Sequence, residues 1–418
     1  MMDPIKRKLG KHERLVREIV EGERRLHELP ADLPPERAAE IRRQAMTELK
    51  RVAWKHTAYF SLDAARASRR HCENFIGVTQ VPLGITGPLV VRGEWVDAEE
   101  EIYVPLATTE GALVASVNRG CRALREAGGA VARVDDVGVT RAPVFRASGI
   151  EEARRFLAWV RDNEPRIREL SESTSRYLKL MDIRAQILGR SIYLRFRFES
   201  GDAMGMNMAT IACDRVVKEL IEPATGVSCV ALSGNYCSDK KPSAINFLEG
   251  RGKRIYAEVT LDGGILKRCL KTDARALVEV QYRKNLLGSI AAGAMGFNAH
   301  YANVLAAFFI ATGQDAAQVV EGAMGVTCVE PSGPEGVFAS VYLPDVPLGV
   351  VGGGTGLDTQ KEALALLGAA PSEKQPGAGA LRLAEILGAT VLAGEISLLA
   401  AFTSGDLAGA HERLGRGK

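Results

Sequence analysis

The sequence of 418 residues is 46% hydrophobic and 25% charged, with a formal net charge of +3. This composition excludes an intrinsically disordered chain, and the length suits two or three globular domains. Glycine is frequent at 43 residues, against a typical share of about 7%. Because the glycines follow no three-residue period, they exclude collagen and indicate a backbone that takes positive φ angles or approaches other groups closely.

The positive charge lies at the start of the chain. Residues 1–55 contain 14 lysines and arginines and 10 acidic residues. The two signs are interspersed, as in Lys11-His12-Glu13-Arg14, which is typical of a solvated helical surface. An arm that binds nucleic acid would be more purely basic and would carry aromatic residues. We therefore expect no nucleic-acid partner.

The seven cysteines are scattered and form no Cys-x-x-Cys pair, so the sequence predicts neither a disulfide framework nor a zinc site. No group of His, Asp and Glu has metal-ligand spacing, and we expect no metal. The N-terminus lacks the apolar segment of a signal peptide. The apolar stretches 286–313 and 386–405 contain His300 and Glu395, which are costly in lipid. We therefore expect buried helices, no membrane span and a cytoplasmic location.

Helices are expected first along the chain. Apolar residues recur at helical spacing within residues 5–60, with prolines at 30, 34 and 35 interrupting them. From about residue 73, short apolar runs between glycines and prolines predict strands and turns. Thr109 is a candidate N-cap for a helix over 110–126 that ends at Gly128-Gly129. A further helix is expected over 151–162.

Strands, loops and long helices follow. Residues 192–198 alternate and predict a strand, which leads through the glycine-rich turn 201–207 into a helix over 209–221. Beyond them, the pattern predicts the strands 227–232 and 337–343, the loops 233–246 and 352–356, and the helices 272–287, 290–312 and 379–403. We therefore expect an α+β fold with a helical N-terminal piece, a larger domain and a smaller unit inserted around 143–231.

Several polar residues in the first half could carry chemistry, and each also has an ordinary structural explanation. Glu110 lies at a predicted helix start, where an acidic residue complements the helix dipole. Arg119 and Arg122 of the same helix could hold phosphates or carboxylates, and surface solvation explains them equally well. The turn 201–207 before a helix has the shape of a phosphate site without the Gly-x-Gly-x-x-Gly fingerprint.

A second group of candidates lies in the C-terminal half. Lys240 is most simply a solvated residue; in a dry site it could instead stabilise an oxyanion, with Asp239 orienting it. His300 and Asn303 lie one turn apart on an apolar helix and could be a satisfied core pair or ligand contacts. Asp315 follows a predicted helix break and is a candidate N-cap.

Five segments, in this order, resemble the signature segments of the 3-hydroxy-3-methylglutaryl-coenzyme A (HMG-CoA) reductase family. They are residues 107–111, 202–207, 233–242, 313–315 and 351–355. The resemblance covers about residues 73–411, and the segments 202–207 and 233–242 match without interruption. Met206 and the Asp-Lys-Lys-Pro sequence at 239–242 are similar to the class I branch, which implies NADPH as reductant.

The resemblance implies the reduction of an acyl-CoA thioester in two hydride transfers, which yields mevalonate, CoA and two NADP⁺. Lys240 would stabilise the oxyanion at the reacting carbonyl. Glu110 would supply the proton in the aldehyde step, a role that requires burial or a neighbouring carboxylate because glutamates are ordinarily ionised at pH 7. Asp315 would link Glu110 and Lys240 through hydrogen bonds, and His411 would protonate the departing CoA thiolate.

The resemblance also implies the binding residues. For the substrate, the matching positions are Arg141, Ser233, Asp239, Lys241, His300, Asn303 and Leu398. For NADPH, they are Ser116, Asn118, Arg119, Arg122, Ser175, Arg176, Tyr177, Asp202, Met204, Gly205, Met206 and Asn207. Arg176 is the candidate for the 2′-phosphate, because an arginine near the ribose favours a phosphate over a hydroxyl.

The implied organisation has three parts: a helical N-terminal domain (1–72), a large α/β domain for HMG-CoA (73–142 and 232–418) and an inserted small α+β NADP-binding domain without a Rossmann fold (143–231). Residues 73–77 resemble the family's dimer contact, so we expect a homodimer or a dimer of dimers with the active site between subunits. The membrane anchor of the eukaryotic enzymes is missing, as in a soluble prokaryotic form, and Gly417 replaces the phosphorylatable serine of the animal enzymes.

Two other functions would use the same residues. A cofactor-free acyl-CoA hydrolase or lyase could employ Glu110, Lys240 and His411, and a catalytically inactive regulator could bind CoA alone. Neither alternative consumes NADPH, so oxidation of NADPH in the presence of HMG-CoA separates the reductase from both.

Overall fold

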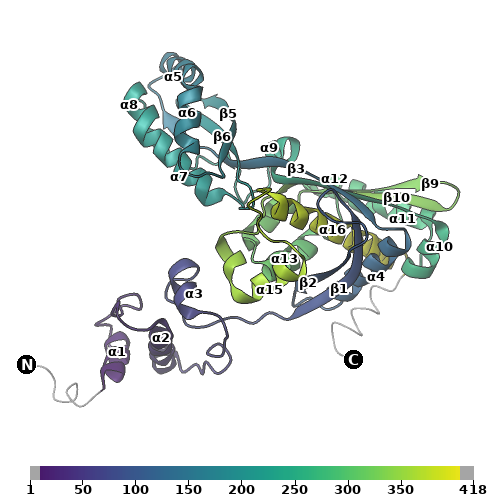
Figure 1. Ribbon diagram of the computed structural model, residues 1–418, viewed down its shortest axis with the longest axis horizontal. Coiled ribbons are helices and arrows are strands. Elements are labelled where there is room, and N and C mark those ends of the chain that lie inside the picture. Colours follow the sequence, from purple (N-terminus) through teal and green to yellow (C-terminus); the bar gives the residue numbers. More distant parts are fainter. Residues whose placement is uncertain (1–9, 405–418) are drawn as a thin grey trace, which may run out of the picture. The chain divides into compact units, whose positions relative to one another are not determined.

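The computed structural model describes residues 10–404 (Figure 1). The chain divides into two compact units, Met1–Pro82 with Gly356–Lys361 and Leu83–Thr355 with Glu362–Lys418. The first unit carries α1 (Lys11–Val20), α2 (Pro35–Lys50) and α3 (Ala64–Arg70). Leu15 and Ile19 of α1 pack against Ile41 of α2, which are apolar positions of the predicted helical pattern. The helices predicted within residues 5–60 are thus confirmed in the described part.

The second unit is built on a sheet that has ten strands in the described part of the chain, in the order β7-β4-β6-β3-β8-β10-β9 with β1, β2 and β5 at its sides. The strands are β1 (Leu83–Arg92), β2 (Glu101–Ala107), β3 (Ala130–Arg141), β4 (Val144–Arg146), β5 (Lys179–Leu188), β6 (Ser191–Glu199), β7 (Cys229–Ala231), β8 (Arg251–Leu261), β9 (Val326–Ser332) and β10 (Gly336–Val346). Described pairs are antiparallel except β1 with β3, which run parallel over two residue pairs. The predicted mixture of helices and strands is confirmed, with a large antiparallel sheet.

Strand β3 connects two parts of this sheet. Its residues 131–138 pair with β8, whereas residues 139–141 pair with β6. Gly138 lies at the change of partner with φ +74, and a Cβ there would lie 2.9 Å from the Phe198 carbonyl oxygen. A side chain would therefore be strained and crowded at this point. The strand ends at Arg141, one of the predicted substrate residues.

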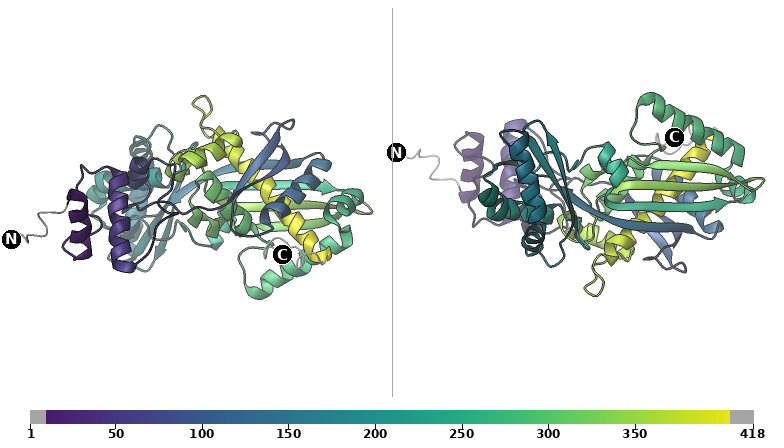
Figure 2. Two further views of the ribbon diagram at one scale, coloured as in Figure 1. Left: turned by 90° about the horizontal axis from the view of Figure 1, so that it is seen from below. Right: turned by 90° about the horizontal axis from the view of Figure 1, so that it is seen from above.

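The main core is centred on α16 (Ala378–Ser404). This helix crosses the face of β3, β8 and β10 and packs on α4 (Leu113–Glu126) and α13 (Tyr301–Thr312) (Figure 2). A Cβ on Gly120 would lie 1.9 Å from the Ala393 carbonyl oxygen, so glycine allows α4 and α16 to approach closely. Within residues 10–404, α16 alone is long and apolar enough to cross a membrane, but 83% of its most apolar window is buried inside the protein. The predicted buried helix is confirmed.

A separate hydrophobic cluster lies beside β5 and β6 and includes Phe145, Phe156, Phe196 and Phe198. The helices α5, α6 and α7 flank it (Figure 1). The elements here are α5 (Ile150–Asp162), α6 (Glu164–Glu172), α7 (Met206–Val216), the π-helical turn η1 (Val217–Ile221) and α8 (Glu222–Thr225). The strand predicted over 192–198 and the helices predicted over 151–162 and 209–221 are confirmed.

Shorter elements complete the described part of the chain, and two predictions are corrected here. They are α9 (Ala244–Glu249), α10 (Gly263–Ile265), η2 (Leu266–Leu270), α11 (Ala274–Val280), η3 (Gln281–Gly288), α12 (Ser289–Ala292), η4 (Ala316–Gln318), α14 (Val319–Gly322), η5 (Gly353–Gly356) and α15 (Asp358–Leu366). The N-cap of α4 is Ala112, at φ 76, and not the predicted Thr109. The helix predicted over 290–312 is broken, because Gly293 ends α12 in a left-handed conformation and α13 begins only at Tyr301.

Candidate functional site

The loop 233–242 has an unusual backbone. Asn235, Ser238 and Lys240 take left-handed φ angles of 65°, 54° and 57°. Non-glycine residues in this region cost about 1–2 kcal/mol each, so surrounding contacts must hold them. Buried side chains provide such contacts, since Asn246 Nδ2 donates to the Ser238 carbonyl oxygen at 3.1 Å and Thr140 Oγ1 donates to that of Cys237 at 3.0 Å.

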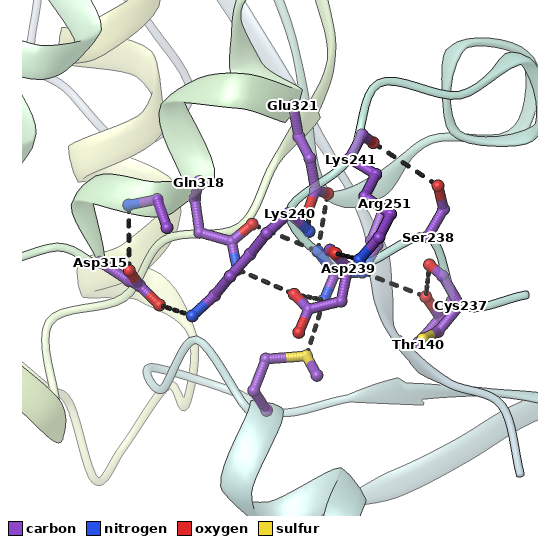
Figure 3. A network of polar contacts seen from close by, with 12 residues as sticks. Thr140, Cys237, Ser238, Asp239, Lys240, Lys241, Arg251, Asp315, Gln318 and Glu321 are labelled. Atoms are coloured by element: carbon purple, nitrogen blue, oxygen red, sulfur yellow. Dashed lines mark hydrogen bonds and ion pairs between the residues drawn. The ribbon is translucent and has the colours of Figure 1, made fainter. Parts of the chain in front are cut away.

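The side chain of Lys240 forms an ion pair with Asp315. Lys240 Nζ lies 2.7 Å from Asp315 Oδ2 (Figure 3). The other oxygen of Asp315 accepts the Ala317 N–H at 3.0 Å at the start of η4, which confirms the predicted N-cap. The side chains of Lys240 and Asp315 are 44% and 32% exposed, so a small molecule can reach the pair.

Asp239 is held rigidly beside Lys240. Its Oδ1 accepts Arg251 Nη2 at 2.9 Å and Gln318 Nε2 at 3.1 Å (Figure 3). Burial alone would raise the pKa of Asp239, but the Arg251 guanidinium and the Gln318 amide hold it below its ordinary value. Asp239 is therefore an ionised and oriented carboxylate at neutral pH.

A cavity of 580 Å³ opens beside the Lys240–Asp315 pair. Its lining comes from five segments that are far apart in the sequence: Arg141; residues 203–208; Asp239 with Lys240; residues 313–315; and Gly349 with residues 351–355. The fold thus gathers predicted catalytic residues with predicted substrate residues and with the predicted cofactor positions Met204, Gly205, Met206 and Asn207.

Gly205 lies at the start of α7, which gives the cavity features of a phosphate-binding site. It is the N-cap of α7 at φ +93, and a Cβ there would lie 2.5 Å from the Ser200 side chain. Residues 205–208 line the cavity at the first turn of α7, where main-chain N–H groups have no helical acceptor. Such a helix start favours a phosphate or carboxylate ligand.

Glu110 lies at a second hollow of 450 Å³, which it lines together with Asn118. Asn303 Nδ2 donates to Glu110 Oε1 at 3.1 Å, so two predicted site residues meet here. The carboxylate of Asp315 contacts Lys240 and the Ala317 N–H instead. The expected link between Asp315 and Glu110 is therefore not a direct contact in the described residues, and it stays a prediction.

His300 lies at the start of α13, as its N-cap, and not in a helix interior. The main-chain N–H groups of Ala299 and His300 donate to the buried carboxylate of Glu395 at 2.8 and 2.7 Å. His300 Nε2 is buried without a hydrogen-bond partner among residues 10–404. Glu395 thus anchors the helix start that carries both His300 and Asn303.

Asp202 is directed away from the cavity. Its carboxylate accepts the N–H groups of Ser372 and Ala380, each at 3.1 Å, and the residue is 9% exposed. It anchors the beginning of α16, and its contact with a cofactor stays a prediction. No sequence signal distinguished this role from cofactor binding, because an acidic residue after a strand suits both.

The predicted cofactor residues of α4 contact other parts of the protein. Arg119 Nε and Ser116 Oγ each lie 3.0 Å from Ser397 Oγ on α16. Asn118 Oδ1 accepts the Gly87 N–H at 3.0 Å. Arg122 pairs with Glu126 at 3.0 Å. These four residues do not line the 580 Å³ cavity, and their cofactor contacts stay predictions.

The remaining predicted residues are dispersed. The guanidinium of Arg176 lies 4.6 Å from the centre of the Tyr177 ring, and Ser175 Oγ accepts the Tyr177 N–H at 3.3 Å. Ser233 Oγ lies 3.5 Å from the sulfur of Cys237, and Lys241 Nζ donates to the Asp239 carbonyl oxygen at 3.3 Å. Leu398 is half-buried on α16. His411 lies outside the described residues.

Three buried residues next to Lys240 were not predicted: Arg251, Gln318 and Glu321. Arg251 is fully buried and donates to Glu321 Oε2 at 2.7 Å as well as to Asp239. The signal that could have found two of them is the spacing of three between Asp315, Gln318 and Glu321, which places side chains on one face of a helical segment. Arg251 starts a strand and carries no such signal.

Comparison with known proteins decides between the functions considered above. A family model described as hydroxymethylglutaryl-coenzyme A reductase matches residues 38–416. This chain belongs to the hydroxymethylglutaryl-coenzyme A reductase family. It is accordingly an oxidoreductase of the mevalonate pathway that reduces HMG-CoA. Among residues 10–404, no group of three His, Cys, Asp or Glu side chains is arranged to hold a metal.

Individual relatives agree with the family. The HMG-CoA reductase of Methanothermobacter thermautotrophicus is 50% identical over 401 residues, which cover 96% of this chain and 99% of that protein. HMG-CoA reductase 1 of Dictyostelium discoideum is 40% identical over 387 residues, 91% of this chain and 69% of that protein. A structure of the class II HMG-CoA reductase from Streptococcus pneumoniae bound to NADPH in open conformations has a TM-score of 0.65 at 18% identity, covering 97% of this chain and 100% of that chain. At this identity the likeness shows a shared fold alone, and the predicted class I assignment stays a prediction.

Proposed function

We propose that this chain converts HMG-CoA to mevalonate, with two NADPH consumed and CoA released, at the cavity beside Lys240 and Asp315. The observation that carries the proposal is the 2.7 Å contact between Lys240 Nζ and Asp315 at a cavity that residues 203–208 also line. A fixed cation and a helix start suited to phosphate thus face one space. This arrangement fits a reaction in which a nicotinamide nucleotide meets a carbonyl group.

The residues at this cavity fit NADPH. Gly205 adopts the left-handed φ of +93° that begins α7, and the first-turn N–H groups of that helix suit a phosphate. Met204, Met206 and Asn207 complete this wall. NADPH, when bound, supplies a hydride in each of the two reduction steps. Arg176, whose side chain is 74% exposed and lies 4.0 Å from the exposed Glu373 carboxylate, is the candidate for the 2′-phosphate.

Protein side chains stabilise the charge that develops in the reaction and donate its protons. The first reduction places negative charge on the thioester oxygen, and Lys240 stabilises it. The carbon–sulfur bond of the resulting hemithioacetal then breaks, and His411 donates a proton to the thiolate to give CoA and mevaldehyde. After the second reduction, Glu110 donates a proton to the alkoxide and mevalonate forms. Asn303, 3.1 Å from Glu110, orients that carboxyl group.

The acyl group carries a free carboxylate, and cationic side chains suit it. Arg141 lines the cavity beside Asp239, and Lys241 lies next to Lys240 in the same loop. Ser233, His300 and Leu398 complete the proposed substrate contacts. The remaining proposed nucleotide contacts are Ser116, Asn118, Arg119 and Arg122 of α4, together with Ser175, Tyr177 and Asp202.

The proposed organisation assigns HMG-CoA to the large domain of residues 73–142 and 232–418, and NADPH to residues 143–231. A hydrophobic cluster of its own, centred on residues such as Phe145 and Phe196, supports the second assignment. We further propose a helical N-terminal domain over residues 1–72, a homodimer or dimer of dimers with shared active sites, and a cytoplasmic location. Met206 and the Asp-Lys-Lys-Pro sequence at 239–242 carry the proposed class I assignment.

A spectrophotometric assay tests the proposal. With HMG-CoA as substrate, we expect two NADPH oxidised for each mevalonate and each CoA formed, and much slower oxidation of NADH. Release of CoA without oxidation of NADPH would refute the reductase and favour a hydrolase or lyase. Binding of CoA with neither product would favour an inactive regulator.

A further inference from the structure

Glu321 is a buried carboxylate that the proposed catalytic roles do not use. It lies on α14 and is fully buried. Three donors from different elements converge on its two oxygens. The Lys240 main-chain N–H donates to Oε1 and Arg251 Nη1 to Oε2 at 2.7 Å (Figure 3), and Asn246 Nδ2 also donates to Oε2, at 3.4 Å. Burial of an ionised carboxylate is unfavourable unless it is paired and hydrogen-bonded, and these contacts meet that requirement.

Glu321 belongs to a set of three side chains that hold one dipeptide. Asp315, Gln318 and Glu321 are spaced by three in η4 and α14 and therefore share a face. Asp315 binds Lys240 Nζ at 2.7 Å, Gln318 binds Asp239 Oδ1 at 3.1 Å, and Glu321 binds the Lys240 main-chain N–H. Lys240 is thus held at both ends, its ammonium group by Asp315 and its main chain by Glu321.

The main chain of Lys240 needs this support. Its φ of 57° is a left-handed conformation that a lysine adopts only when its surroundings impose it. The lysine side chain is long and flexible, so the place of Nζ depends on where the main chain sets Cα. A displacement of about 1 Å at a reacting group can lower the rate roughly 100-fold.

We propose that Glu321 is a positioning residue for Lys240: by accepting the Lys240 main-chain N–H, it holds the left-handed turn that presents the ammonium group to the reacting carbonyl. Glu321 acts through Lys240 and does not touch the substrate. The inference rests on the proposed function, because it concerns the residue to which that function assigns the oxyanion.

Asp345 offers a matched control from the same buried cluster. It is fully buried on β10, beside Glu321 and Asn246. Burial and the neighbouring Glu321 raise the pKa of Asp345 well above its ordinary range. Asp345→Asn keeps the size of this side chain and does not alter Glu321, which makes the Lys240 contact.

The decisive variant is Glu321→Asp, which keeps the negative charge beside Arg251 but is one methylene shorter. It cannot contact Arg251 and the Lys240 N–H together. For HMG-CoA reduction, we expect kcat to fall about tenfold or more in Glu321→Asp and to stay within about twofold of wild type in Asp345→Asn. The KM values for HMG-CoA and NADPH should change less than about threefold, because ground-state binding is not affected. Equal kcat values in the two variants, or a loss confined to KM, would overturn the proposal.

A measurement on the unaltered chain keeps the test valid if Glu321→Asp does not fold. The Lys240 amide should exchange slowly with deuterium, because its N–H donates to a buried carboxylate. Rapid exchange would overturn the proposal. Failure of the proposed function gives a different result, since the wild-type chain would then oxidise no NADPH in the presence of HMG-CoA.

Discussion

Lys240→Ala removes the cation assigned to the oxyanion, and the structure allows its effect to be estimated. Lys240 Nζ lines the cavity and is held 2.7 Å from Asp315. A unit charge about 4 Å from a developing oxyanion contributes ~4 kcal/mol at an effective dielectric constant of about 20. The Lys240 side chain is 44% exposed, so water screens part of this interaction. We therefore expect a loss of ~3–4 kcal/mol of transition-state stabilisation, which lowers kcat about 10²- to 10³-fold.

The assay follows NADPH absorbance at saturating HMG-CoA. The KM for NADPH should stay near the wild-type value, because Lys240 acts on charge that develops only in the transition state. Lys218→Ala is the matched control, since Lys218 is 67% exposed and pairs with Asp214 on the protein surface. We expect it to retain wild-type kcat. A Lys240→Ala enzyme within about fivefold of wild type would refute the electrostatic argument.

Three further predictions concern a proton donor, the nucleotide site and stability. His411→Gln should slow HMG-CoA reduction about 100-fold and spare the reduction of added mevaldehyde, because only the first reaction releases a thiolate; equal losses in the two assays would contradict this role. Gly205→Ala places a Cβ 2.5 Å from Ser200 at φ +93 and should weaken NADPH about tenfold in a fluorescence titration; unchanged affinity would exclude this cavity as the nucleotide site. Asp345→Asn should raise Tm at pH 8, because the raised pKa of Asp345 makes the folded chain keep a proton that the unfolded chain loses above about pH 3.9. The gain should shrink toward pH 4, and a gain independent of pH would be inconsistent with a raised pKa of Asp345.

The pattern of apolar residues in the sequence correctly predicted those elements whose burial follows directly from residue type. The alternation over 192–198 predicts β6, and the long apolar run at 379–403 predicts α16, because their burial is visible in residue type alone. The start of α4 was misplaced, because Ala112 adopts a left-handed φ of 76° that residue preferences do not predict. The break at Gly293 was missed for a similar reason, since a glycine within an apolar run can lie in a helix or end it.

At the site, too, residue type alone did not predict which groups come into contact. Asp202 and Glu110 are both acidic residues near a helix start, but the fold turns Asp202 toward main-chain N–H groups of residues 372 and 380 and leaves Glu110 at a hollow with Asn303. Their sequence neighbourhoods carry no information about this difference. The difference arises because the hydrogen-bond donors to each carboxylate lie more than 100 residues away in the sequence. Only the packing of the folded chain brings them next to it.

The sequence by itself determined the chemistry that is available: the lysine, the carboxylates and the glycines of the five signature segments, and the family to which they point. Only the tertiary structure decided which of these groups meet. Lys240 and Glu321 are 81 residues apart, and their contact exists because η4 and α14 lie under the loop 233–242. Local propensity acts over a few residues, whereas the buried ion pairs that hold this loop depend on the packing of distant elements. The glycine excess follows the same rule, since Gly205 is required by its left-handed φ of +93° and by Ser200, which lies against it in the folded chain.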